Sequence, residues 1–201
     1  EPLVHLTCKD KNRNQIESQL YALDRAGIKN LLVMSGDYPV SGYLGRPAPV
    51  FDLDPLHVLQ LISEMNRGLE YPARSGTIRH QPSNFFAGAV VSPFKATEAE
   101  QMAQYYKLKK KIAAGAQFIV TQLGYDIRKF QEVLLFMKQN NVSIPLMGNI
   151  YILPFTTAKM MNRNEFPGSI VTDKLLAEID HERTETDKGA GAKILRASRM
   201  Y

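Results

Sequence analysis

The sequence predicts an α/β fold built on a parallel sheet. Short apolar runs, each typical of a buried strand, alternate along the chain with longer amphipathic stretches typical of helices. Runs that are almost wholly apolar, such as 118–120, favour a parallel sheet covered on both faces. Five such strand–helix units indicate a TIM-type barrel, although eight strands need about 250 residues and this chain has 201. The sheet is therefore either open and doubly wound, or part of a barrel whose remaining strands are not in this chain.

Local patterns place the elements of the first half. Ile16, Leu20 and Leu23 recur at helical spacing, and Gly27 follows them where a helix would end. The next long stretch, 38–54, is rich in Gly and Pro and predicts an irregular loop. The expected order is strand 3–7, helix 16–26, strand 31–34, loop 38–54, a helix with Leu56, Leu59, Ile62 and Met65 on one face, loop 68–84 and strand 85–91.

The best-marked helix begins near Thr97. Acidic residues occupy its first turn and lysines its later turns, which complements the helix dipole, and Gly115 lies near its end. The expected order after it is strand 117–122, a helix at 127–137 with Ile127, Phe130, Leu134 and Met137 inward, strand 144–147, and helical segments around 156–162, 172–182 and 186–200. We expect one domain over residues 1–201, because this length buries an ample core.

The composition excludes several classes of protein. The net charge of +5 is modest and mixed with 20 acidic residues, so it indicates anionic small molecules rather than nucleic acid. A single cysteine rules out a disulfide framework or Cys-rich zinc module and favours a reducing cytoplasm. The longest uncharged stretch, 139–158, is too rich in Asn, Pro and Thr to span a bilayer. We expect no signal peptide, and a start further upstream, since no initiator Met is present.

In parallel α/β folds, ligands bind at the carboxyl ends of the strands. His5 and Cys8 lie in such a segment, but positions i and i+3 of a strand face opposite sides, so no metal site is expected there. The run from Gly189 to Lys193 faintly resembles a phosphate-binding loop. No strand precedes it and the Lys-Ser/Thr spacing is missing, so a plain helix start is the better interpretation.

Two strand ends carry more suggestive residues. Gly36 follows a buried strand and permits close approach of a ligand, while Asp37 places a carboxylate at the mouth of the sheet; a turn with a capping Asp explains them as well. Gln122 ends another strand, where its amide either contacts a heteroaromatic ring or caps the next helix. The lysines from Lys107 to Lys111 are typical of a solvated helical face, and no Ser-His-Asp or Cys-His arrangement stands out.

Short motifs follow the strand ends in order over most of the chain. They are His5-Leu6-Thr7-Cys8, Gly27-Ile28, Ser35-Gly36-Asp37, Leu108-Lys109-Lys110-Lys111-Ile112, Ala114-Gly115-Ala116, Thr121-Gln122, Tyr125-Asp126, Gly148, Pro154-Phe155, Ala158-Lys159 and Phe166-Pro167. This series resembles the central segment of methylenetetrahydrofolate reductases. The resemblance implies a (β/α)8 TIM-type barrel that holds FAD at the carboxyl ends of its strands. This chain would then lack the first two strands and the last.

The resemblance implies an oxidoreductase of one-carbon metabolism and methionine biosynthesis. Enzymes of this family reduce 5,10-methylenetetrahydrofolate to 5-methyltetrahydrofolate. Reduced nicotinamide (NAD(P)H) gives a hydride to N5 of FAD, and the folate then takes it. The implied ligands are folate and nicotinamide, with no metal, nucleic acid or membrane, and the implied assembly is a homo-oligomer or a complex with a partner subunit.

Cofactor-binding residues carry over by position. His5 matches the histidine that lines the flavin site, and Gly36 with Asp37 matches the loop under the isoalloxazine. Ala89 matches a small strand residue beside the cofactor. Lys111 matches the lysine that meets the polar tail of the flavin, which distinguishes it from the solvated lysines around it.

Substrate-binding residues carry over in the same way. Asp37 matches the carboxylate that hydrogen-bonds the folate pterin and biases the flavin, which makes it the catalytic residue implied in this chain. Gln122 matches a glutamine that contacts folate, and Phe155 matches an aromatic residue that stacks on the substrate.

Several positions depart from the family pattern. The family's catalytic glutamate and a threonine belong to the first two strands, outside this chain. Ser35 stands where many members have arginine, Val91 and Lys95 replace an aromatic residue and a histidine near the adenine and phosphates, and Gln104 replaces an acidic residue. These changes make the mouth more basic and leave FAD binding to be tested.

Two other functions stay open. One is a non-catalytic or flavin-free relative that binds folate or docks to a methyltransferase partner. The other is an unrelated phosphate-binding barrel such as an aldolase, for which Lys95, in a loop, is the nearest candidate for a Schiff-base lysine.

Overall fold

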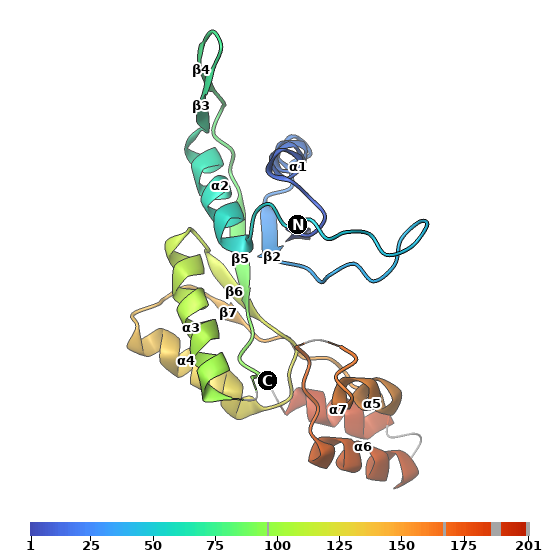
Figure 1. The fold of residues 1–201 in the computed structure, drawn as a ribbon. Helices are drawn as coiled ribbons and strands as arrows, with labels where there is room; N and C mark the ends of the chain where they lie inside the picture. The colour runs from blue at the N-terminus through green and yellow to red at the C-terminus, as the bar shows by residue number, and fades with distance from the viewer. Residues whose placement is uncertain (96, 167, 186–189, 200–201) are drawn as a thin grey trace. The chain divides into compact units, whose positions relative to one another are not determined.

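The computed structural model describes residues 1–95, 97–166, 168–185 and 190–199. One sheet contains, in spatial order, β1 (Leu3–Thr7), β2 (Asn30–Met34), β5 (Phe86–Val91), β6 (Phe118–Thr121) and β7 (Leu146–Met147) (Figure 1). The spatial order of these strands follows their order in the chain, as in a barrel, whereas a doubly wound sheet reverses direction at a switch point. The predicted α/β class and TIM-type architecture are confirmed.

The chain forms two compact units, which are described in turn. The first comprises Glu1–Val90 with Lys107–Ile119, and the second Val91–Tyr106 with Val120–Tyr201. The single domain expected over residues 1–201 stays a prediction.

The first unit contains parallel strand pairs of fixed register. β1 pairs with β2 and β2 pairs with β5, which places His5 opposite Leu32 and Val33 opposite Ala89. The β2 side chains Leu31, Leu32 and Val33 are buried. The prediction that these apolar runs are strands of a parallel sheet is therefore confirmed.

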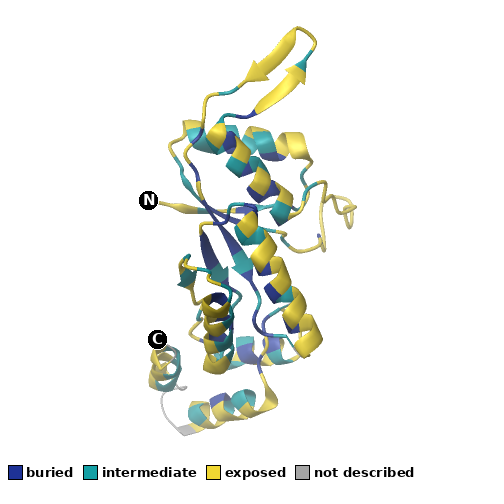
Figure 2. Ribbon diagram, turned by 90° about the vertical axis from the view of Figure 1, so that its left-hand side faces the viewer, coloured by how far each residue is buried: buried dark blue, intermediate teal, exposed yellow. Residues whose placement is uncertain are grey.

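Two capped helices accompany these strands. α1 (Arg13–Arg25) begins at a capping box, in which Asn12 accepts from the backbone of Gln15 and the Gln15 side chain accepts from Asn12. α2 (Pro55–Arg67) begins where the Asp54 carboxylate accepts from the amide of His57. Each helix buries one apolar stripe, visible in dark blue in Figure 2, made of Ile16 and Leu20 in α1 and of Val58, Leu59, Ile62 and Met65 in α2. Both predicted helices are confirmed.

The prediction that residues 68–84 form a loop is wrong in part, because this segment contains an antiparallel hairpin. β3 (Glu70–Ala73) pairs with β4 (Gly76–Arg79), and Tyr71 lies opposite Ile78. In Figures 1 and 2 the hairpin extends past the end of α2, and almost all of its residues are exposed. Since neither face is buried, no apolar alternation marked these strands in the sequence.

The second unit carries the remaining helices. α3 (Glu98–Ala113), which both units share, begins at Thr97 as predicted: the amide of Glu100 donates to Thr97 Oγ1 over 3.3 Å, and the amide of Thr97 donates to a Glu100 carboxylate oxygen over 3.2 Å. The others are α4 (Ile127–Gln139), α5 (Phe155–Asn162), α6 (Asp173–Glu185) and α7 (Ala190–Ser198). All four were expected close to these bounds.

The inward face of α4 differs from the expected one. Phe130 and Met137 are buried as predicted, but the third buried residue is Val133. Ile127 and Leu134 are 43% and 51% exposed, so their predicted burial is wrong. Phe130, Val133 and Met137 also follow helical spacing. The predicted and the observed faces share Phe130 and Met137, and contacts with neighbouring elements decide which face is buried.

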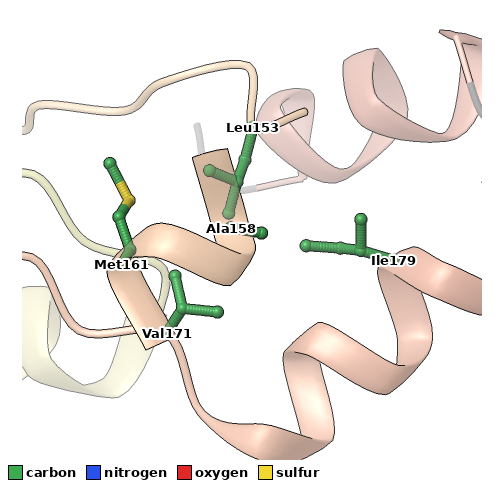
Figure 3. Packing of buried hydrophobic residues seen from close by; sticks show 5 residues of the cluster. All are labelled: Leu153, Ala158, Met161, Val171 and Ile179. Carbon is green, nitrogen blue, oxygen red and sulfur yellow. The ribbon is translucent and has the colours of Figure 1, made fainter. Parts of the chain in front are cut away.

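A small apolar cluster forms the core beneath α5 and α6. Figure 3 shows its members, which are Leu153, Ala158, Met161, Val171 and Ile179. Side chains that pack against this cluster from outside include Tyr125, Phe155 and Leu175. No helix within the described ranges is both long and apolar enough to cross a bilayer.

Gly88 in β5 provides a test of this packing. A Cβ at this position would lie 2.2 Å from the Phe118 ring, which is buried and stacked on Phe86 with ring centroids 5.2 Å apart. Because the ring has little room to move, Gly88→Ala should destabilise the fold by roughly 1–3 kcal/mol and lower the melting temperature by about 2–4 °C per kcal/mol. Thermal unfolding followed by circular dichroism measures the change.

Gly191→Ala is the matched control. Outside the backbone of α7, no atom of the described residues lies within 4 Å of a Cβ at this position, so the same substitution should raise stability by roughly 0.5–1 kcal/mol through helix propensity. Equal effects of the two variants would contradict the close packing of Gly88 on Phe118.

Candidate functional site

His5 in β1 and Cys8, which directly follows this strand, differ in burial. His5 is exposed, whereas Leu6 and Cys8 are 1% exposed, consistent with alternation along an extended chain. Burial, followed by the nearby Asp54 carboxylate, raises the pKa of the Cys8 thiol to about 11. The thiol is therefore protonated at neutral pH, which suits neither a nucleophile nor a metal ligand. Among the described residues, no three His, Cys, Asp or Glu side chains converge as a metal site would require.

The ends of β1 and β2 remain hydrogen-bonded beyond the strands. The amide of Cys8 donates to the Met34 carbonyl and that of Lys9 to the Ser35 carbonyl, each over 3.0 Å. This alignment brings Gly36 against the Lys9 side chain, where a Cβ would lie 2.8 Å from Lys9 Cδ. Gly36 also has a φ of +80°, which favours glycine, and the Lys9 side chain would have to shift to admit a Cβ here.

Asp37 follows this glycine and is exposed. Its carboxylate makes no hydrogen bond or ion pair with any residue that the structure describes. It does not cap a helix, because α2 begins at Asp54. Both Asp37 carboxylate oxygens are thus free to accept from a ligand.

Lys111 differs from its neighbours in the lysine run. Lys107, Lys109 and Lys110 are exposed, but Lys111 is half-buried and its Nζ donates to the Val90 carbonyl over 2.6 Å. Burial lowers the pKa of the Lys111 ammonium, with a smaller contribution from Lys107, while Asp54 and Cys8 act in the opposite direction. The ammonium has three N–H donors, so this one bond leaves donors for an anionic ligand.

Ala89 occupies the middle of β5 and is fully buried opposite Val33. Its neighbour Gly88 is equally small, so two consecutive residues of this strand carry almost no side chain. His5, Gly36, Asp37, Ala89 and Lys111 all belong to the first unit. The structure thus gathers the whole set implied for the cofactor within one compact unit.

Gln122 belongs to the second unit, where its backbone continues the sheet by donating to the Val91 carbonyl over 2.7 Å. Its Oε1 accepts from the Leu123 amide over 2.9 Å, so the side chain is partly engaged by the local backbone. Gly168, with a φ of +82°, passes so close that a Cβ there would lie 3.0 Å from Nε2 of Gln122. The half-buried amide keeps its donor side for a ligand.

Thr121 precedes this glutamine and is 1% exposed. Its Oγ1 accepts from the amide of Asn149 over 2.9 Å, which ties the end of β6 to the segment after β7. Thr121 is therefore structural.

Phe155 is the first residue of α5 and is half-buried against the cluster of Figure 3. The Arg183 guanidinium of α6 lies 4.4 Å from the centroid of its ring. This cation–π contact covers part of the aromatic surface that the resemblance implies for substrate stacking. The sequence carried no signal for the pair, because 28 residues separate the partners.

The positions that depart from the family pattern differ in exposure. Val91 is buried, Lys95 and Gln104 are half-buried and Ser35 is exposed. Gly189 and Pro167 lie outside the described residues. Lys193 lies within α7, as the interpretation of this segment as a helix requires.

Comparison with known proteins identifies the family. The family model described as methylenetetrahydrofolate reductase matches residues 1–196. A probable methylenetetrahydrofolate reductase (NADPH) of Caenorhabditis elegans is 23% identical over 194 residues, covering 94% of this chain and 26% of that protein. Methylenetetrahydrofolate reductase 1 of Schizosaccharomyces pombe is 27% identical over 152 residues, covering 73% and 22%. The chain thus spans about a quarter of the length of these relatives.

A solved structure shows the same fold. It is an uncharacterized protein from Clostridium thermocellum that binds two copies of 5-methyl-5,6,7,8-tetrahydrofolic acid. It matches with a TM-score of 0.59 and 11% identity, covering 98% of this chain and 58% of that one. Since the family model spans almost the whole chain, this chain belongs to the methylenetetrahydrofolate reductase family.

Proposed function

We propose that the chain is the flavin- and folate-binding part of a reductase that converts 5,10-methylenetetrahydrofolate to 5-methyltetrahydrofolate with NADH or NADPH. The observation that carries the proposal is Lys111 of α3, a half-buried cation whose Nζ donates to the Val90 carbonyl of β5, within the unit that also holds Gly36 and Asp37. Relatives named as NADPH- and NADH-dependent reductases support it, as does a structural neighbour that binds a methylated folate.

The residues of the first unit fit FAD. A dinucleotide needs a cation for its diphosphate, and Lys111 has spare donors in partly buried surroundings, where charge interactions are stronger than in water. A flat ring system needs a surface with little side chain, which Gly36 provides, whereas Ala89 is fully buried within β5 and offers no exposed surface. His5, exposed on β1, would line the same site. When bound, FAD supplies the two-electron carrier between nicotinamide and folate.

The chain's own residues would bind and orient the folate. The free carboxylate of Asp37 accepts from N–H groups of the pterin, and its charge biases the electronics of the site. Gln122 donates through Nε2 while its Oε1 stays on the Leu123 amide. Phe155 offers the part of its ring that Arg183 leaves uncovered.

The setting proposed for this activity is the cytoplasm, in a homo-oligomer or with a partner subunit. Residues outside the chain would complete the site, including an acid on the family's first strand. The competing function is a flavin-free relative that binds folate or docks to a methyltransferase, and cofactor binding separates the two.

The first test concerns Lys111. In the full-length protein, Lys111→Met should weaken FAD binding by about ten- to a hundredfold, because a charge-assisted hydrogen bond contributes roughly 1.5–3 kcal/mol. Quenching of flavin fluorescence on titration measures the affinity. Lys109→Met, which removes an exposed lysine of the same helix, should leave the affinity unchanged. No FAD binding by the unaltered protein would favour the flavin-free function.

The second test concerns Asp37. Asp37→Asn keeps the shape and removes the charge, so folate reduction should fall by about ten- to a hundredfold, and by more than nicotinamide oxidation. Stopped-flow measurement of the two half-reactions separates these effects. Equal losses in both would assign Asp37 a structural or purely electronic role instead.

The third test concerns Gln122. Gln122→Glu retains an oxygen for the Leu123 amide and loses only the Nε2 donor, so the melting temperature should hardly change. Folate affinity should weaken by roughly 1–3 kcal/mol, the cost of an unpaired partner. Gln139→Glu, at the exposed end of α4, is the matched control for the added charge. If Gln122→Glu lowers stability and flavin content but not folate affinity, the assignment is wrong.

A further inference from the structure

The second unit contains two adjoining cavities, with volumes of about 370 and 400 Å³. They share one wall, to which Tyr125, Ile127, Leu175 and Glu178 contribute. Volumes of this size suit small organic ligands. Of the positions that the resemblance places near flavin or folate, only Lys95 lines either cavity; His5, Gly36, Asp37, Ala89, Lys111, Gln122 and Phe155 do not.

Two polar atoms on this groove are buried without a partner among the described residues. They are the Tyr125 hydroxyl and Nη1 of Arg196. Buried donors almost always have a partner, because an unpaired donor loses its bonds to water and gains nothing in return. Tyr125 packs against the cluster of Figure 3, which holds its ring in place. Each of the two is a donor without an acceptor among the described residues, and a ligand oxygen would supply that acceptor.

Each of these donors keeps its proton at neutral pH. Burial raises the pKa of the Tyr125 hydroxyl well above its usual range. Burial lowers the pKa of the Arg196 guanidinium, which nevertheless remains charged. Nη2 of Arg196 already donates to the Glu182 carboxylate, so the charge of the guanidinium is largely balanced. This end of the groove therefore needs an acceptor oxygen rather than a second full negative charge.

The other end of the groove is positive. Arg128 and Lys129 line it, but they form ion pairs with Asp126 and Glu132. Lys95 and Lys174 line it too, and neither forms an ion pair within the described ranges. These two ammonium groups share the lining with one carboxylate that forms no ion pair among the described residues, that of Glu178, so the net charge beside the apolar wall is positive and favours an anionic group attached to an apolar body.

We propose that this groove binds an elongated aromatic anion, whose carbonyl oxygen accepts from Tyr125 and Arg196 and whose carboxylate or phosphate meets Lys95 and Lys174. The aromatic body lies along the shared wall, against Ile127, Leu175 and the Tyr125 ring. Lys95 is the one residue that the groove shares with the positions implied for flavin or folate, whereas Tyr125, Arg196 and Lys174 belong to none of them, so the proposal does not rest on the proposed reductase activity.

Three matched compounds test the proposal by calorimetric titration of the full-length protein. The compounds are 4-acetamidobenzoate, 4-acetamidophenyl phosphate and the neutral acetanilide. At least one anion should bind saturably below about 10 mM, and acetanilide should bind about tenfold more weakly or not at all. The preferred anion tells whether a carboxylate or a phosphate is the natural group. Failure of both anions to bind would overturn the proposal.

Tyrosine variants show where the anion binds. Tyr125→Phe removes a hydroxyl that has no partner among the residues the structure describes, so it should weaken binding of the anion by about tenfold while the melting temperature stays constant or rises. Tyr105→Phe is the matched control: its hydroxyl donates to Glu132 over 2.8 Å, so this variant should lose stability and keep the affinity.

A lysine variant tests the other end. Lys174→Met should weaken binding of the anions and leave any weak binding of acetanilide unchanged. Binding of the anions that is unaffected by both Tyr125→Phe and Lys174→Met would place the ligand elsewhere and overturn the proposal.

Discussion

The parallel register of β1, β2 and β5 is the constraint on which the candidate site depends. With His5 opposite Leu32 and Val33 opposite Ala89, the three strands end at the same edge of the sheet. The ladder continues past β1 and β2 through the amides of Cys8 and Lys9. A slip of one residue would exchange the two faces of a strand, bury His5 and expose Leu6. His5, Gly36, Asp37 and Ala89 take their places from this register, and Lys111 of α3 reaches the same strands through the Val90 carbonyl.

The close contacts made by glycine have a similar role. At Gly36 a positive φ disfavours any other residue, the Lys9 side chain lies against the backbone, and Asp37 follows directly. At Gly88 the Phe118 ring occupies the space that a side chain would fill. Gly36 thus lies at the edge of the sheet that carries the candidate site, while Gly88 leaves room for an aromatic ring in the core. The residue type alone does not reveal this difference.

Much of the fold could be predicted because buried parallel strands are marked by apolar runs and helices by caps. The hairpin at 70–79 could not, since a ribbon with both faces in water has no period to detect. The inward face of α4 depended on packing partners: two stripes of the same spacing compete, and Val133 is buried in place of Leu134.

The candidate site was predictable to a smaller extent. Among the lysines at 107–111, only tertiary structure distinguishes Lys111, through the Val90 carbonyl. The resemblance pointed to the same residue, but periodicity alone did not. Tyr125 and Arg196 gave no signal, because the Tyr125 hydroxyl and Nη1 of Arg196, which have no partner among the described residues, lie on elements 71 residues apart in the chain.

The most direct measurement of the central claim is the visible absorbance spectrum of the purified full-length protein. The proposed function predicts a flavin band that bleaches on addition of reduced nicotinamide and returns on addition of 5,10-methylenetetrahydrofolate. A protein that stays colourless after incubation with FAD, or whose bleached band the folate does not restore, would contradict the account.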